Sequence, residues 1–144
     1  MNNSLSKYSD FGVLLMRLSI GIIFMFVHGL GKLTGGRELW KRLGNAMSNF
    51  GINFLHEFWG FMAMFSEFFV PIFLILGFLY RPALFLIIFT MIVAASNHLF
   101  KLDPWGKVAY PLVMVFVFTS MFIMGPGKYS IDYYIKQRKK VNEA

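Results

Sequence analysis

The sequence predicts an all-α integral membrane protein whose chain crosses the bilayer four times as a helical bundle. The first observation is composition: of 144 residues, 57% are hydrophobic, 19% aromatic and only 15% charged, whereas soluble domains carry about 25% charged residues. A soluble chain of this length has too much surface for its volume to hide that apolar excess. The second observation is the presence of four apolar segments, each with at most one charged residue.

These segments are taken in chain order. The first covers residues 11–30 and the second residues 58–80, and both reach the length of about 20 residues that a spanning helix needs. The third (82–97) and fourth (108–124) contain no charged residue and lie near the lower limit of about 17 residues. No small-residue cleavage pattern follows the first segment, and Arg17 lies inside it, so we interpret it as a retained helix.

The connections between the segments differ in kind. Residues 31–57 contain an amphipathic basic stretch, which predicts a short interfacial helix or a reentrant loop. Residues 77–81 are too few for anything but a tight turn, so the second and third helices are expected to be antiparallel neighbours. The break at Gly125-Pro126-Gly127 ends the fourth helix, and a short helix is expected to restart at Ser130 or Asp132 and run through Ile135.

The chain is therefore divided into an N-terminal tail (1–10), a membrane domain (11–135) and a basic C-terminal tail (136–144). Four spans place both termini on one side of the membrane. The Lys and Arg residues outside the spans divide almost evenly between the two sides, so we base the orientation on the basic cluster at residues 136–140. The positive-inside rule then favours cytoplasmic termini.

Polar and small residues recur at helical spacing within the spans. Charged groups in a bilayer are costly unless they are paired, so each is a functional hypothesis, and a shared helix face is expected to point into the bundle. The first face carries Arg17, Gly21, Phe24 and His28; the second carries Glu57, Gly60, Met64, Glu67 and Pro71; the third carries Thr90, Ala94, Asn97 and Lys101, with His98 beside it.

Arg17 and Glu67 are predicted to form an ion pair inside the bundle. At about 1.5 Å of rise per residue, their backbones differ in depth by roughly 9 Å, which the two side chains together can cover. Such a pair is interpreted either as a salt bridge that fixes the register of the helices or as part of a site where Glu67 handles protons or binds a headgroup.

A second polar set collects at the membrane surface opposite the termini. One interpretation is ordinary capping of helix ends, and the other is a pocket with a polar rim, suited to a quinone or lipid-like ligand. No His-Glu-x-x-His spacing occurs, so no metal site is predicted. The absence of cysteine excludes thiol chemistry by the chain itself, and the net charge of +7 beside apolar segments indicates membrane contact rather than nucleic-acid binding. The polar set at the membrane surface opposite the termini comprises His28, Lys32, His56, Glu57, Asn97, His98, Asp103 and Tyr110.

Taken together, these motifs resemble the DoxX family of small membrane proteins from about residue 11 to residue 135. The resemblance is carried by Leu15-Met16-Arg17-Leu18 with Gly21, Phe26-Val27-His28-Gly29, Lys32-Leu33, Glu67, Gly77-Phe78-Leu79-Tyr80-Arg81, Asn97-His98, Tyr110-Pro111-Leu112 and residues 125–132.

The resemblance implies four membrane helices in a bacterial cytoplasmic (inner) membrane and an association with redox systems such as thiosulfate:quinone oxidoreductase. We expect an accessory subunit that binds quinone or a lipid-like molecule for a membrane or periplasmic redox protein, with a homo-oligomer as one arrangement. The alternatives are a small transporter and a purely structural subunit of a larger complex. The candidate ligand-binding or proton-handling residues are Arg17, His28, Glu67, Asn97, His98 and Tyr110, and the secondary candidates at the rim are Lys32, Glu57 and Asp103.

Overall fold

The computed structural model describes residues 3–143, with side chains from Tyr8 onward, and this part of the chain contains helices and no strand. Four helical segments are long and apolar enough to cross a membrane, which confirms the predicted fold class. In chain order the spans are Tyr8–Thr34, His56–Leu76, Tyr80–Phe100 and Trp105–Met124.

The first span is built from three consecutive helical elements that differ in their hydrogen-bond spacing. An α-helix is followed by a single π-helical turn and then by a short α-helix, and π-helical turns are frequent at functional sites. The inserted π turn changes the direction in which the later side chains point. The three elements are α1 (Asn3–Ile23), η1 (Phe24–Gly29) and α2 (Leu30–Thr34).

The second span is interrupted, and its cause is Pro71. The span consists of α4 (His56–Phe68) and α5 (Val70–Leu76). Proline has no backbone N–H, so it cannot donate to the carbonyl four residues earlier, which belongs to Glu67. The chain continues into α5 through the hydrogen bond from Ile72 N to Phe69 O at 3.0 Å.

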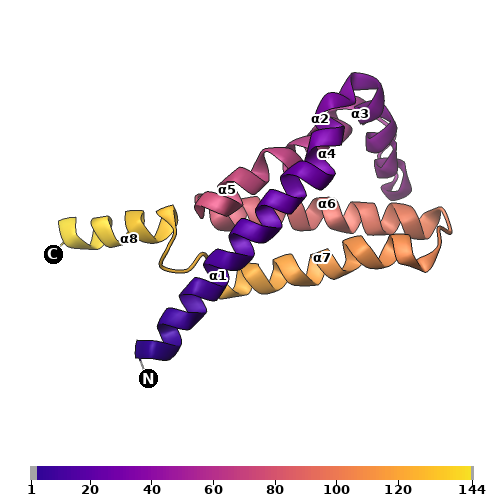
Figure 1. Cartoon of the computed structure of the whole chain (residues 1–144). Helices are drawn as coiled ribbons and strands as arrows, with labels where there is room; N and C mark the ends of the chain where they lie inside the picture. Colours follow the sequence, from indigo (N-terminus) through magenta and orange to yellow (C-terminus); the bar gives the residue numbers. More distant parts are fainter. Residues whose placement is uncertain (1–2, 144) are drawn as a thin grey trace.

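The third and fourth spans are continuous helices that pack side by side as an antiparallel pair (Figure 1). They are α6 (Tyr80–Phe100) and α7 (Trp105–Met124), each a few residues longer than the apolar run that predicted it. A tight turn joins α5 to α6, with Gly77 at a φ of 63° and Leu79 at 46°. Asp132 accepts hydrogen bonds from the backbone N–H groups of Leu79 (3.0 Å) and Tyr80 (2.9 Å) and so caps the start of α6.

The connection between the first two spans forms a short helical excursion. It consists of α3 (Gly36–Gly44) and the 3-10 helix η2 (Asn45–Phe50), in agreement with the predicted interfacial helix. α3 packs closely against α4 because both helices present glycine at the contact. A Cβ on Gly44 would overlap the backbone of His56, and one on Gly60 would overlap the backbone of Trp40.

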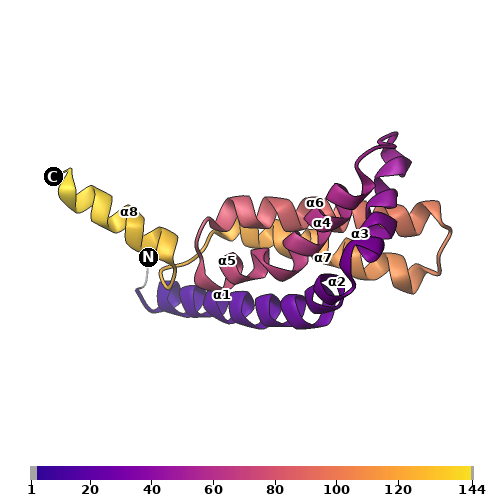
Figure 2. The same ribbon diagram turned by 90° about the horizontal axis from the view of Figure 1, so that it is seen from above.

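The last helix, α8 (Ile131–Asn142), is longer than predicted, because it continues through the basic residues after Ile135. Both ends of the described chain lie at one end of the molecule, whereas α3 and the α6–α7 connection lie at the other end (Figures 1 and 2).

The buried core draws on all four spans and comprises Phe24, Val70, Leu74, Tyr80, Ala83, Leu84, Ile87, Met91, Phe118 and Met121. Large apolar side chains on the outside, among them Phe85 and Phe116, are about two-thirds exposed and fit a lipid environment.

Candidate functional site

A cavity of about 630 Å³ lies between the interfacial elements α3 and η2, the second span and the third span. Its volume falls within the range of about 300–1,000 Å³ that is usual for small-molecule sites. Apolar side chains make up much of its wall, including Met47, Phe58, Met62, Ala63, Leu86, Phe89, Val93 and Ala94. The predicted stripe of the third span forms one side of it through Thr90, Ala94, Asn97 and Lys101.

The deep end of the cavity holds a buried ion pair between Glu67 of α4 and Lys32 of α2. The Glu67 side chain is 3% exposed and the Lys32 side chain 24%. Glu67 lies eleven residues into α4, about 16 Å along the helix. The carbonyl of Lys32 accepts a 2.7 Å hydrogen bond from the indole N–H of Trp40, so α3 holds α2 in place.

Close packing between η1 and α4 brings Lys32 within reach of Glu67. The contact lies at Gly29, where a Cβ would overlap the Glu67 carbonyl and the Phe68 backbone. That carbonyl is the one left without its helical donor by Pro71. Gly29 has no side chain and Pro71 has no backbone N–H, and both features concern the backbone carbonyl of Glu67: Gly29 packs against it, and Pro71 leaves it without a helical donor.

Two hydrogen-bonding groups in the cavity wall are buried and have no partner among the described residues. They are the indole N–H of Trp59 and the hydroxyl of Ser66, both on α4 and seven residues apart, so they share one helix face. Ser66 as a whole is only 1% exposed. The two residues line the cavity, while the indole nitrogen and the hydroxyl oxygen themselves are covered by protein. A buried donor without a partner costs about 1–3 kcal/mol, so a ligand acceptor that reached either group would remove that cost.

The mouth of the cavity contains Asn97, His98 and Lys101 at the end of α6. Asn97 accepts a 3.4 Å hydrogen bond from Asn49 of η2, and His98 Nδ1 lies 2.8 Å from Asp103 Oδ2. The hydrogen bond with His98 holds the pKa of the Asp103 carboxyl below its usual range. These contacts fix the turn between α6 and α7 beside the opening.

His28 and Tyr110 form a separate pair that links η1 to α7. The Tyr110 hydroxyl lies 2.7 Å from His28 Nε2, and the two rings stack with centroids 4.9 Å apart. Neither residue lines the cavity. Of the six candidate residues, therefore, Glu67, Asn97 and His98 share the cavity, whereas His28 and Tyr110 form the bridge.

The predicted ion pair between Arg17 and Glu67 is wrong. Arg17 is 1% exposed, and its guanidinium donates to four backbone carbonyls. The cause is the position of α5, whose last turn lies about 10 Å beyond Glu67 at the level of Arg17 and presents carbonyls without helical donors there. The four acceptors are Leu74 (2.9 Å), Ile75 (2.6 Å), Pro126 (2.9 Å) and Tyr129 (2.9 Å).

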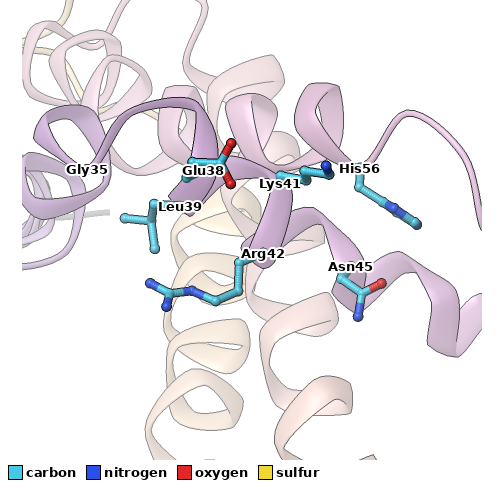
Figure 3. A pocket seen from close by; sticks show the side chains of 7 residues that line it. All are labelled: Gly35, Glu38, Leu39, Lys41, Arg42, Asn45 and His56. Carbon is cyan, nitrogen blue, oxygen red and sulfur yellow. The ribbon is translucent and has the colours of Figure 1, made fainter.

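Glu57, predicted at the rim, lies outside the cavity and pairs with Arg37 of α3. This pair lines an open depression of about 440 Å³. A neighbouring open depression of about 640 Å³ lies on the outer surface of α3 (Figure 3). Figure 3 shows the side chains around this depression, with Glu38 and Lys41 drawn above Arg42. The depression is lined by Gly35, Glu38, Leu39, Lys41, Arg42, Asn45 and His56.

Sequence reasoning missed Trp59, Ser66 and Arg42 as parts of the cavity. Ser66 adjoins the singled-out Glu67, and its spacing of seven from Trp59 was a usable signal. The pairing of Lys32 was beyond reach, because the π turn shifts the helical phase before it. Within the residues that the structure describes, no group of three or more His, Cys, Asp or Glu side chains is arranged to hold a metal ion.

Comparison with known proteins identifies the family of the chain. A search of curated proteins and a search of solved structures each found no similar protein. The family model named DoxX matches residues 12–100, which cover most of the first span, the second and third spans, the interfacial helix and every cavity residue except Lys101. The chain belongs to the DoxX family.

Proposed function

We propose that the protein is an accessory subunit of a membrane redox system that binds a quinone, or a similar amphiphile with a carbonyl-bearing head, in the cavity between α3, α4 and α6. One observation carries the proposal: Trp59 and Ser66 line a mainly apolar cavity and hold buried polar groups without partners, which a side-chain rotation would turn toward a bound ligand. A ligand of this class supplies acceptors for the donors and an apolar body for the walls.

The ion pair between Glu67 and Lys32 at the deep end supplies groups that suit the chemistry of a quinone. Reduction of a quinone consumes protons, and we assign their transfer to the Glu67 carboxylate of the ion pair that borders the cavity. The Lys32 ammonium also donates hydrogen bonds and carries a positive charge, which favours a carbonyl oxygen that gains electron density. Because the chain has no cysteine, electrons reach the ligand from a partner rather than from thiols.

The transporter alternative relied on a polar path through Arg17 and Glu67. These side chains belong to separate clusters, since Arg17 is enclosed by carbonyls at the level of α5. The observation that favoured transport is therefore gone. We place the subunit in a bacterial inner membrane with cytoplasmic termini, so that the cavity mouth faces the periplasmic side, where a redox partner can dock.

Trp59 provides the test, because its fluorescence reports contact with a quinone inside the cavity. The purified chain is titrated with a short-chain ubiquinone analogue, and the quenching of its tryptophan fluorescence is measured. The contribution of Trp59 is the part of this quenching that is absent in the Trp59→Phe variant. Ser66→Ala is expected to weaken binding roughly fivefold, the worth of about one hydrogen bond. The matched control is Ser120→Ala, because Ser120 is an exposed serine on α7 whose hydroxyl donates to its own helix at 2.8 Å.

A second measurement separates a binding serine from a merely structural one. Ser66→Ala removes a buried hydroxyl without a partner, so it should raise the unfolding temperature of the ligand-free protein while it weakens quinone binding. If binding is unchanged in Ser66→Ala, or if Trp59→Phe leaves the quenching intact, the quinone does not occupy this cavity and the proposal fails.

A further inference from the structure

Two basic side chains at the cavity mouth have no carboxylate partner. Arg42 comes from α3 and Lys101 from the residue after α6, and both line the cavity. Among the residues whose side chains are described, neither takes part in an ion pair or a side-chain hydrogen bond. Both are exposed at the surface of the molecule.

The nearby carboxylates are already engaged elsewhere. Glu67 pairs with Lys32 and Glu57 with Arg37, while Asp103 contacts both His98 and Lys107, the latter at 3.6 Å. Glu38 lies one turn before Arg42 on α3, but the two side chains form no ion pair. The mouth therefore carries two basic side chains that form no ion pair with a carboxylate among the described residues.

The mouth also lies at the depth of lipid headgroups. Lys101 directly follows the third span, and Arg42 belongs to the short helix that covers the same end of the bundle. Basic residues at this depth attract anionic lipids. Directly inward of them the cavity is walled by apolar side chains such as Phe58, Met62 and Val93, which suit an acyl chain.

We propose that the mouth of the cavity is a headgroup site for an anionic phospholipid of the leaflet opposite the termini. The phosphate lies between Arg42 and Lys101, and one acyl chain enters the cavity between α4 and α6. Arg42 provides a planar, bidentate donor that matches phosphate, and Lys101 provides a second charge. The headgroup contacts lie at the mouth and do not involve Ser66, so the site is tested without quinone; an acyl chain and a quinone use the same apolar walls and therefore exclude each other from the cavity.

Brominated lipids test the site through Trp59. The full chain is reconstituted without quinone in vesicles of phosphatidylcholine that contain a minor fraction of either phosphatidylglycerol or phosphatidylcholine with dibrominated acyl chains. The contribution of Trp59 is the difference in fluorescence quenching between the wild-type chain and the Trp59→Phe variant. Phosphatidylglycerol is expected to bind at least about fivefold more tightly than phosphatidylcholine, from the usual effect of one basic residue near the surface.

Substitutions of single basic residues show which side chains cause the preference for phosphatidylglycerol. Arg42→Gln and Lys101→Gln should each reduce it severalfold, whereas Arg42→Lys should retain part of it. Lys41→Gln is the matched control, because Lys41 is an adjacent basic residue on α3 that lines the outer depression and not the cavity.

Three results would overturn the proposal. Equal quenching by the two lipids in the wild-type chain means that the mouth faces something else, such as an acidic protein. A preference that survives in both glutamine variants means that it arises elsewhere. A preference lost equally in Lys41→Gln means a diffuse surface effect. Failure of the quinone test with Ser66→Ala would leave each of these results interpretable.

Discussion

At the scale of single residues, the protein solves the problem of a buried charge in two ways. Glu67 of the second span is neutralised by Lys32, which reaches it from the end of the first span. Arg17 has no carboxylate partner and instead satisfies four carbonyls that helix ends and a turn leave open. A cation at the C-terminus of α5 also lies at the negative end of the helix dipole.

Arg17 is predicted to be a major determinant of stability rather than of ligand binding. Arg17→Gln removes the charge and most of the donors, so several buried carbonyls lose their partners and the free energy of unfolding should fall by about 3 kcal/mol or more. Thermal unfolding in detergent measures the loss, and Arg138→Gln on the exposed helix α8 is the control. A stable Arg17→Gln with impaired quinone binding would contradict this assignment.

At the scale of elements, the cavity exists because α3 packs directly on α4. Glycines at the contact let the two backbones approach, and the Trp40 ring packs edge-on against Phe61 with centroids 5.3 Å apart. This contact places α3 and η2 over the space between α4 and α6. The wall of the cavity thus depends on the absence of two side chains.

Gly60→Ala is predicted to displace α3 and to damage the cavity. Its Cβ would overlap the Trp40 backbone, and overpacking of this kind costs about 1–3 kcal/mol. Quenching of Trp59 by the quinone should fall together with the unfolding temperature. The control is Gly31→Ala in α2, where a Cβ meets nothing within 4 Å and should stabilise the helix by about 0.5–1 kcal/mol. Equal effects of the two substitutions would exclude a specific role for the contact.

At the scale of the whole molecule, the two ends of the bundle differ. The end with the termini is closed by Arg17 and by Asp132, which caps α6, while Lys128 pairs with Asp10 at 3.0 Å. The opposite end carries the open cavity and the unpaired basic side chains. Because the cavity opens only at the end opposite the termini, a ligand is expected to enter it from that side of the membrane or from that leaflet.

This polarity predicts the outcome of labelling with a membrane-impermeant maleimide. The chain contains no cysteine, so single cysteines can be introduced without a background signal. Gln137→Cys on α8 should react only from the cytoplasmic side, and Asn49→Cys on η2 only from the other side. Labelling of both positions from one side in sealed vesicles would refute the four-span topology, and the reverse pattern would invert its orientation.

The sequence by itself determined the number of spans, the short helix after the first span and the helix faces that point inward, because apolar length and a period of 3.6 residues are local properties. The stripe of Thr90, Ala94, Asn97 and Lys101 was predicted from spacing alone and forms a wall of the cavity. The sequence also singled out the two buried charges.

Only the tertiary structure decided which groups these charges contact. The π turn at Phe24–Gly29 and the break at Pro71 shift the phase and level of the residues that follow, and a uniform rise per residue does not capture either one. Arg17 therefore meets carbonyls of α5, and Glu67 meets Lys32. The cavity likewise depends on backbone contacts at Gly44 and Gly60, which depend on how two helices pack and not on either helix alone.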